Sequence, residues 1–263
     1  MLTATWATSS RGISFFLQTA VKPMNSLIDR IEDHPTGAVL RNGGMGVNEV
    51  ARRLEAGEPP DGLLRAASLQ PRDLIAALVW LGLGGPATEG LALVPESPRH
   101  PKLAKALAPP ALATLFPDAN QPALLALASG LLQSHDFWDA SHNAAQEADD
   151  LGEQTASAYW HGIAHRREPD AGNALYWFRR VGRHPLFGPL GIAARDLLVE
   201  RRRDDLADRL ITRQGTWDPS AFVDATETAR RGGPDATICR QLQRLEMVLL
   251  LDVSLQAVET APV

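Results

Sequence analysis

Apolar residues recur at helical spacing along most of this chain. Positions 0, +3, +4 and +7 of one stretch would share a single helix face, and they hold Val47, Val50, Ala51 and Leu54. Gly57 follows within a turn, and glycine is common just beyond the end of a helix. Strand-like alternation of apolar and polar residues is nearly absent. The pattern therefore predicts an all-α fold.

Prolines mark the start of the next two predicted helices. Pro59-Pro60-Asp61 opens a second short helix, and Pro71-Arg72-Asp73 opens a third that ends in the glycines before Pro86. Proline suits the first turn of a helix because the N–H that it lacks would have no partner there. We predict a small three-helix unit over residues 44–83, within an N-terminal segment 24–83.

This unit resembles a known family. The residues that carry the resemblance are Gly44-Met45-Gly46-Val47, Leu54, Gly57-Glu58-Pro59, Leu63-Leu64, Leu69-Gln70-Pro71-Arg72-Asp73-Leu74 and Ala77-Leu78. They are similar to the antitoxin-like domain of unknown function that accompanies PIN-type toxins, a tri-helical relative of helix-turn-helix proteins. The family usually has Thr-Arg where Met45-Gly46 stand and Tyr where Trp80 stands. The resemblance implies DNA binding or docking to a partner; a bundle that merely packs on the rest of the chain is the alternative.

Residues 84–121 differ from their neighbours because they are rich in glycine and proline. Proline removes a helix donor and biases the residue before it away from the α region. We therefore expect a connector with short helices at 101–108 and 111–115, and we place a domain boundary there.

The rest of the chain, residues 122–263, is predicted to be an array of antiparallel helix pairs. The expected helices are 122–133, 135–150, 153–168, 171–183, 187–200, 204–213, 219–231 and 235–258. Two of their segments look alike and place Trp138 and Trp177 39 residues apart, since 177 − 138 = 39. Residues 135–200 thus resemble tetratricopeptide or Sel1-type helix pairs, without the Gly-x-x-Tyr spacing of those families.

Composition and charge exclude several classes of protein. The chain has 263 residues, 44% of them hydrophobic, and a formal net charge of −5, so it can bury a core and is not suited to charge-driven binding of nucleic acid or anionic membranes. The single cysteine, Cys239, excludes an intrachain disulfide and a Cys-rich zinc site, which suits a cytoplasmic protein. We expect nucleic acid to be a partner only through residues 44–83.

The first 23 residues carry no recognisable targeting signal. The apolar stretch 13–21 is far shorter than the ~20 residues of a membrane helix and lacks a basic region before it. We predict no membrane span and a disordered tail over residues 1–23, with a short helix that caps the core as the alternative for 13–21.

Charges are sorted by sign in the second half of the chain. Residues 106–165 hold no Lys or Arg and seven acids, for a net charge of −7, whereas residues 166–213 hold eleven Arg and seven acids, and 11 − 7 gives +4. Because adjacent segments of opposite charge attract, we predict that an acid of the first segment pairs with an arginine of the second. The acids are Asp136 or Asp139, and the arginines are Arg166, Arg167, Arg179 or Arg180.

Four of the seven histidines lie on two neighbouring predicted helices. Residues 135, 139 and 142 share one face of the first helix, and residues 161, 165 and 168 share one face of the second. Imidazoles and carboxylates on facing helices can hold a divalent metal. The candidate ligands are His135, Asp139, His142, His161, His165 and Glu168, and the corresponding function is a metal-dependent helical hydrolase.

The same region offers a second kind of site. Arginine side chains with flat aromatic surfaces could bind a phosphate or carboxylate, and the candidates are Trp160, His165, Arg166, Arg167, Tyr176, Trp177, Arg179 and Arg180. We take a non-enzymatic interaction or anionic-ligand-binding protein, with a protein partner or a small anionic ligand, as the leading hypothesis. The metal-dependent hydrolase and a DNA-linked regulator are the alternatives.

A third interpretation makes these residues structural. The aromatic side chains would then form the core between helices, and the histidines and arginines would bond to the acidic helices. No catalytic residue is assigned from the sequence, since neither a G-x-S-x-G motif nor a Walker loop is present.

Overall fold

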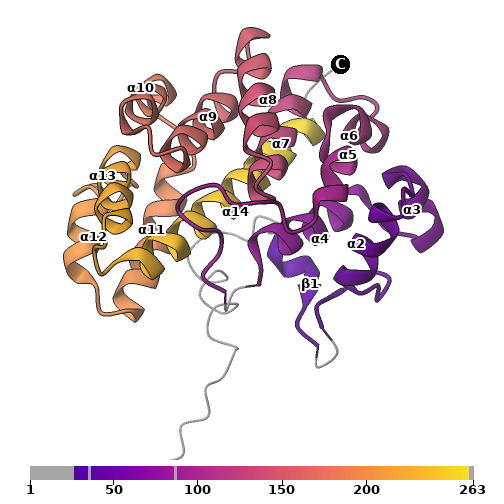
Figure 1. Cartoon of the computed structure of the whole chain (residues 1–263), viewed down its shortest axis with the longest axis horizontal. Coiled ribbons are helices and arrows are strands. Elements are labelled where there is room, and N and C mark those ends of the chain that lie inside the picture. Colours follow the sequence, from indigo (N-terminus) through magenta and orange to yellow (C-terminus); the bar gives the residue numbers. More distant parts are fainter. Residues whose placement is uncertain (1–26, 35–36, 86–87, 261–263) are drawn as a thin grey trace, which may run out of the picture.

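The computed structural model describes residues 27–34, 37–85 and 88–260, and it is all-α apart from one small hairpin (Figure 1). The predicted tail at residues 1–23 lies outside the described residues. The hairpin pairs β1 (Ile31–Glu32) with β2 (Val39–Leu40) antiparallel, with Ile31 opposite Leu40. It follows a short 3₁₀ turn, η1 (Leu27–Arg30). Two residues per strand are too few to show an alternating pattern, so this hairpin could not be predicted from apolar spacing.

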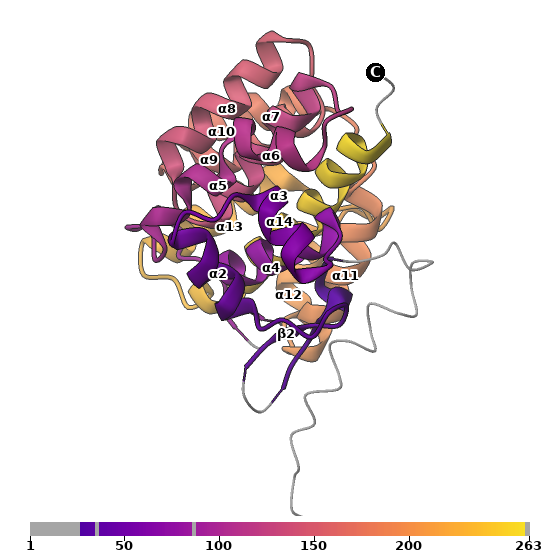
Figure 2. The same cartoon turned by 90° about the vertical axis from the view of Figure 1, so that its right-hand side faces the viewer.

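Three helices follow the hairpin where proline and glycine predicted them. They are α2 (Val47–Glu55), α3 (Pro60–Ala67) and α4 (Pro71–Leu83). The start of α4 is fixed by a reciprocal cap, in which the Gln70 side chain bonds the backbone of Asp73 and the Asp73 carboxylate bonds the backbone of Gln70. These helices lie on the face seen in Figure 2, beside α5 (Ala104–Leu107) and α6 (Pro109–Leu115), which follow the 3₁₀ turn η2 (Pro101–Leu103).

The glycine- and proline-rich stretch 84–121 contributes to the core. Its leucines at 91, 93, 103, 107, 112 and 115 are all buried. One continuous cluster of buried side chains extends through the segments 24–83, 84–121 and 122–263.

The second half of the chain consists of helices in succession. They are α7 (Gln121–Ser134), α8 (Trp138–Asp150), α9 (Ala156–Arg167), α10 (Ala171–Val181), α11 (Phe187–Glu200), α12 (Asp204–Leu210), α13 (Pro219–Arg230) and α14 (Ala236–Thr260). Side-chain caps define three of their starts, because Asn120, Asp170 and Asp218 each accept a hydrogen bond from the first turn of α7, α10 and α13. Each predicted helix is confirmed, with ends that differ by a few residues.

The longest helix, α14, crosses the middle of the molecule (Figure 1). It packs against α4, α7, α9, α11 and α13, so it touches both halves of the chain. Within the described residues, no helix is both long enough and apolar enough to cross a membrane.

Candidate metal centre

Three histidines from two helices meet at one point. His142 lies on α8, and His161 and His165 lie one turn apart on α9, which packs along α8. One ring nitrogen of each residue lies within 4.8 Å of the others. His161 and His165 are buried and His142 is half-buried, so the cluster is shielded on the side of α9 and open on the side of α8.

The closest approach is between the Nε2 atoms of His142 and His161, which lie 2.8 Å apart. The two rings meet edge to face, with centroids 4.3 Å apart. Two nitrogens bound to one tetrahedral zinc at about 2.0–2.1 Å each would lie roughly 3.3 Å apart. The two Nε2 atoms would therefore have to move apart by about half an ångström to bind the same zinc ion.

His165 is oriented by a carboxylate. Its Nδ1 bonds Oε2 of Glu168 at 2.8 Å, so Nε2 is the ring nitrogen that could bind a metal. Metal-binding histidines usually donate the second ring N–H to such an acceptor, and the partner fixes the tautomer and the ring orientation. Glu168 thus has the position of an outer partner of a metal ligand.

Asp170 is the third member of a second group of close side chains, with His165 and Glu168. Its carboxylate already accepts hydrogen bonds from the backbone N–H and the side-chain amide of Asn173 at the start of α10. Because Glu168 is already bonded to His165 and Asp170 to Asn173, the three histidines are the better candidate ligand set for a metal.

Aromatic rings hold the histidines in place. The Trp177 ring stacks on His161 with centroids 3.8 Å apart, and Trp138 stacks on His142 at 5.2 Å. The indole N–H of Trp138 also donates to the carbonyl oxygen of Ala164 on α9 at 2.9 Å. The side chain that stacks on a histidine of α8 is therefore tied to the helix that carries the other two.

Burial keeps two of these histidines neutral. Loss of hydration lowers the pKa of His161 to about 3, and the nearby His142, His165 and Arg180 add to the effect. The pKa of His142 is lowered as well, first by burial and then by His165. A neutral imidazole is the form that binds a metal, so both rings are in that form at pH 7.

Three of the six predicted metal ligands lie outside the three-histidine cluster: Glu168, which bonds His165, and the residues His135 and Asp139. His135 is buried and its Nε2 bonds the carbonyl oxygen of Leu78 at 2.8 Å, and burial lowers its pKa to about 4. Because α8 begins at Trp138, residues 135 and 142 do not share a helix face, and the ring of His135 contacts α4 instead. Asp139 is exposed on α8 and belongs to neither group of close ligand atoms.

The predicted anion-binding residues divide into buried and exposed sets. Trp160, Arg166 and Arg167 are buried, so these three side chains face the interior and not an external ligand. Trp160 donates to Ser254 and Arg166 to the carboxylate of Glu246. The exposed set comprises Tyr176, Arg179 and Arg180, while Trp177 is buried against His161 and His165 belongs to the three-histidine cluster.

The predicted pairing of acidic and basic segments is confirmed. Arg167 pairs with Asp136, and both side chains are buried. On the surface, Arg180 pairs with Asp149 at 2.9 Å while its guanidinium lies 5.0 Å from the centroid of the Trp177 ring.

One buried acid of the interior was missed from the sequence. Glu246 of α14 accepts hydrogen bonds from the Tyr159 hydroxyl at 2.9 Å and from the Trp217 indole at 3.3 Å, in addition to its ion pair with Arg166. Its position within the otherwise apolar run from Leu245 to Leu251 could have indicated a buried acid with a charged partner, since buried charges need partners.

The segment 44–83 shows three arginines that are paired within the segment. Arg52 bonds Glu49, Arg53 bonds Glu58 and Arg65 bonds Asp61.

Comparison of the chain with protein-family models, with curated proteins and with solved structures gave no match.

Proposed function

We propose that this chain is a metal-binding protein in which His142, His161 and His165 hold one divalent transition metal ion. The observation that carries the proposal is the convergence of one ring nitrogen from each histidine within 4.8 Å. Burial, which keeps two of the rings neutral, and the Glu168 bond, which orients the third, both support it.

Zinc is the metal that we expect the three imidazoles to favour among the common biological cations, with copper, iron and nickel as related choices. Zinc sites with three protein ligands and a free fourth position are of the catalytic kind, in which the metal lowers the pKa of a bound water. The half-buried side of His142 is where that position would face solvent. The proposal therefore includes a water-activating centre suited to a hydrolase.

The test is zinc stoichiometry of the full-length protein after equilibration with Zn²⁺ and removal of the free ion. We expect one zinc per chain in the wild type and its loss in His142→Ala, His161→Ala and His165→Ala. His100→Ala is the matched control, since His100 is half-buried and its ring bonds Glu55 at a distance from the cluster. A wild type without zinc, or equal zinc in the three variants, would contradict the proposal.

An anionic ligand bound near this centre is a second candidate, and the exposure of Arg180 and Tyr176 favours it. Tyr176 is 46% exposed and packs edge-on against Trp177, over which Arg180 also lies. We expect inorganic phosphate to bind the zinc-loaded protein and Arg180→Gln to weaken that binding, as measured by calorimetry. Arg195→Gln, which removes another exposed arginine, is the control.

A DNA-linked regulatory role for residues 44–83 stays a hypothesis from the resemblance. The pairing of Arg52, Arg53 and Arg65 with acids of the same segment gives it no support from charge.

A further inference from the structure

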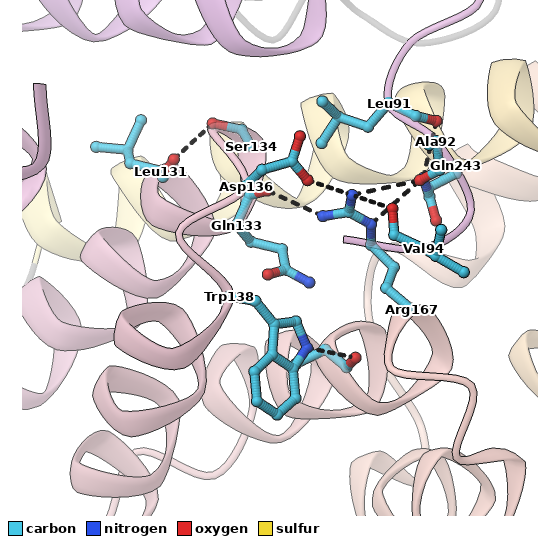
Figure 3. Close-up of polar contacts among 11 residues, drawn as sticks. Leu91, Ala92, Val94, Leu131, Gln133, Ser134, Asp136, Trp138, Arg167 and Gln243 are labelled. Carbon is cyan, nitrogen blue, oxygen red and sulfur yellow. Dashed lines mark hydrogen bonds and ion pairs between the residues drawn. The ribbon is translucent and has the colours of Figure 1, made fainter. Parts of the chain in front are cut away.

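Arg167 lies at the end of α9, two residues after His165, and is completely buried (Figure 3). Its guanidinium donates to the carbonyl oxygens of Gln133, Ala92 and Val94 at 3.2–3.3 Å. It also pairs with the Asp136 carboxylate. One side chain of α9 is thus bonded to the end of α7, to the loop before η2 and to the turn that precedes α8.

Asp136 occupies a turn that sets the direction of α8. Its φ is +63°, a left-handed conformation that Asp and Asn tolerate better than most residues. Two residues later α8 begins at Trp138, and His142 follows about one turn into that helix. A change in the position of Asp136 therefore moves the start of the helix that carries His142.

The neighbouring residue, Arg166, also forms a buried ion pair, but with a different helix. Arg166 pairs with Glu246 of α14, and both side chains are buried. Side chains of consecutive helical residues point about 100° apart, so Arg166 bonds α9 to α14 and Arg167 bonds α9 to the turn before α8. Of the two ion pairs, the one between Arg167 and Asp136 joins the segments that carry the histidines, because α14 contributes none to the cluster.

We propose that Arg167 and Asp136 are positioning residues for the metal centre, a role that rests on the proposed function. Their ion pair fixes α8 against α9 so that His142 faces His161 and His165. The indole bond from Trp138 to Ala164 is a second, neutral link between the same two helices. Loss of either link lets the His142 ring shift relative to the other two while all three ligands remain in the sequence.

The experiment uses Co²⁺ in the full-length protein, because its visible spectrum reports the number and geometry of the ligands. Asp136→Asn keeps the left-handed turn and the side-chain shape and removes the charge. We expect it to weaken Co²⁺ binding by at least about tenfold and to change the spectrum, by analogy with losses of 10–100-fold on removal of outer partners. Glu246→Gln, which leaves the buried Arg166 without its partner, is the matched control and should keep the wild-type spectrum.

Each protein is measured at low temperature, with its fold checked by circular dichroism. If Asp136→Asn does not fold, Trp138→Phe tests the second link in the same way, because it keeps an aromatic ring on His142 and removes the bond to Ala164. A folded Asp136→Asn or Trp138→Phe with wild-type spectrum and affinity would overturn the positioning role. A wild type that binds no Co²⁺ and no Zn²⁺ would instead overturn the metal centre itself.

Discussion

Gly130 of α7 lies directly against the indole of Trp160 on α9. A Cβ atom added at Gly130 would lie 2.5 Å from Cζ2 of Trp160 and 2.8 Å from a methyl carbon of Leu251 on α14. Glycine at this position therefore lets three helices approach one another at the centre of the core, where Trp160 donates its indole N–H to Ser254 at 3.1 Å.

Gly130→Ala should destabilise the fold, since overpacking of a dense core typically costs about 1–3 kcal/mol. Gly188→Ala on α11 is the control, because nothing lies within 4 Å of the added Cβ and alanine favours a helix over glycine. Urea denaturation of both variants gives the free energies of unfolding. Equal values for the two would contradict the steric explanation.

Glu168→Gln should reduce the affinity for Zn²⁺ by about 10–100-fold, because it removes the charge that orients and polarises His165. Competition with a chromophoric chelator measures the affinity. Glu200→Gln, an exposed acid at the end of α11, should bind zinc like the wild type. An unchanged affinity in Glu168→Gln would show that the Glu168 contact plays no part in metal binding.

The free energy of unfolding should fall as the pH is lowered from 7 to 5. Burial lowers the pKa of His135 and of His184 to about 4 and that of His161 to about 3, so over this range the unfolded chain binds at least three protons that the folded chain does not. Asp252 acts in the opposite sense, because burial raises its pKa to about 6 and the folded chain holds that proton. The difference is at least two net protons, which corresponds to about 2.7 kcal/mol per pH unit between pH 5 and 6.

Urea denaturation at a series of pH values measures this slope. Asp252→Asn removes the opposing group, so its slope should approach that of three protons. A free energy of unfolding that stays constant or rises between pH 7 and pH 5 would mean that these histidines are protonated in the folded chain.

Glu246→Gln should destabilise the fold by about 3–5 kcal/mol, because it leaves the buried guanidinium of Arg166 without its counter-charge. Asp61→Asn breaks the exposed pair with Arg65 and should cost no more than about 1 kcal/mol. Thermal unfolding of the two variants and the wild type makes the comparison. Similar losses would show that the Arg166 pair is hydrated in solution.

Helix positions could be predicted from the sequence because apolar spacing, proline and glycine act locally. The helix of residues 187–200 was placed with both ends correct, whereas the one expected at 135–150 begins at Trp138. The difference arises at Asp136, whose left-handed backbone forms a turn that no periodicity reveals. This turn is also why His135 lies outside the three-histidine cluster.

The candidate site could be predicted in part. The i, i+4 spacing placed His161 and His165 on one face, but the meeting with His142 depends on how α8 and α9 pack, which is a long-range property. The burial of a side chain was harder to predict than its position on a helix, because two consecutive arginines such as Arg166 and Arg167 are typical of a protein surface. Their acidic partners, 80 and 31 residues away in the chain, are what allow both to lie in the interior.

The central position of α14 also bears on how the chain is made. This helix, residues 236–260, packs against α4 and α7, and the ion pair from Arg72 to Asp252 joins residues 180 positions apart. During synthesis on the ribosome, α4 and α7 emerge long before their apolar faces have this partner. Their apolar faces are therefore covered late, only after α14 has been synthesised.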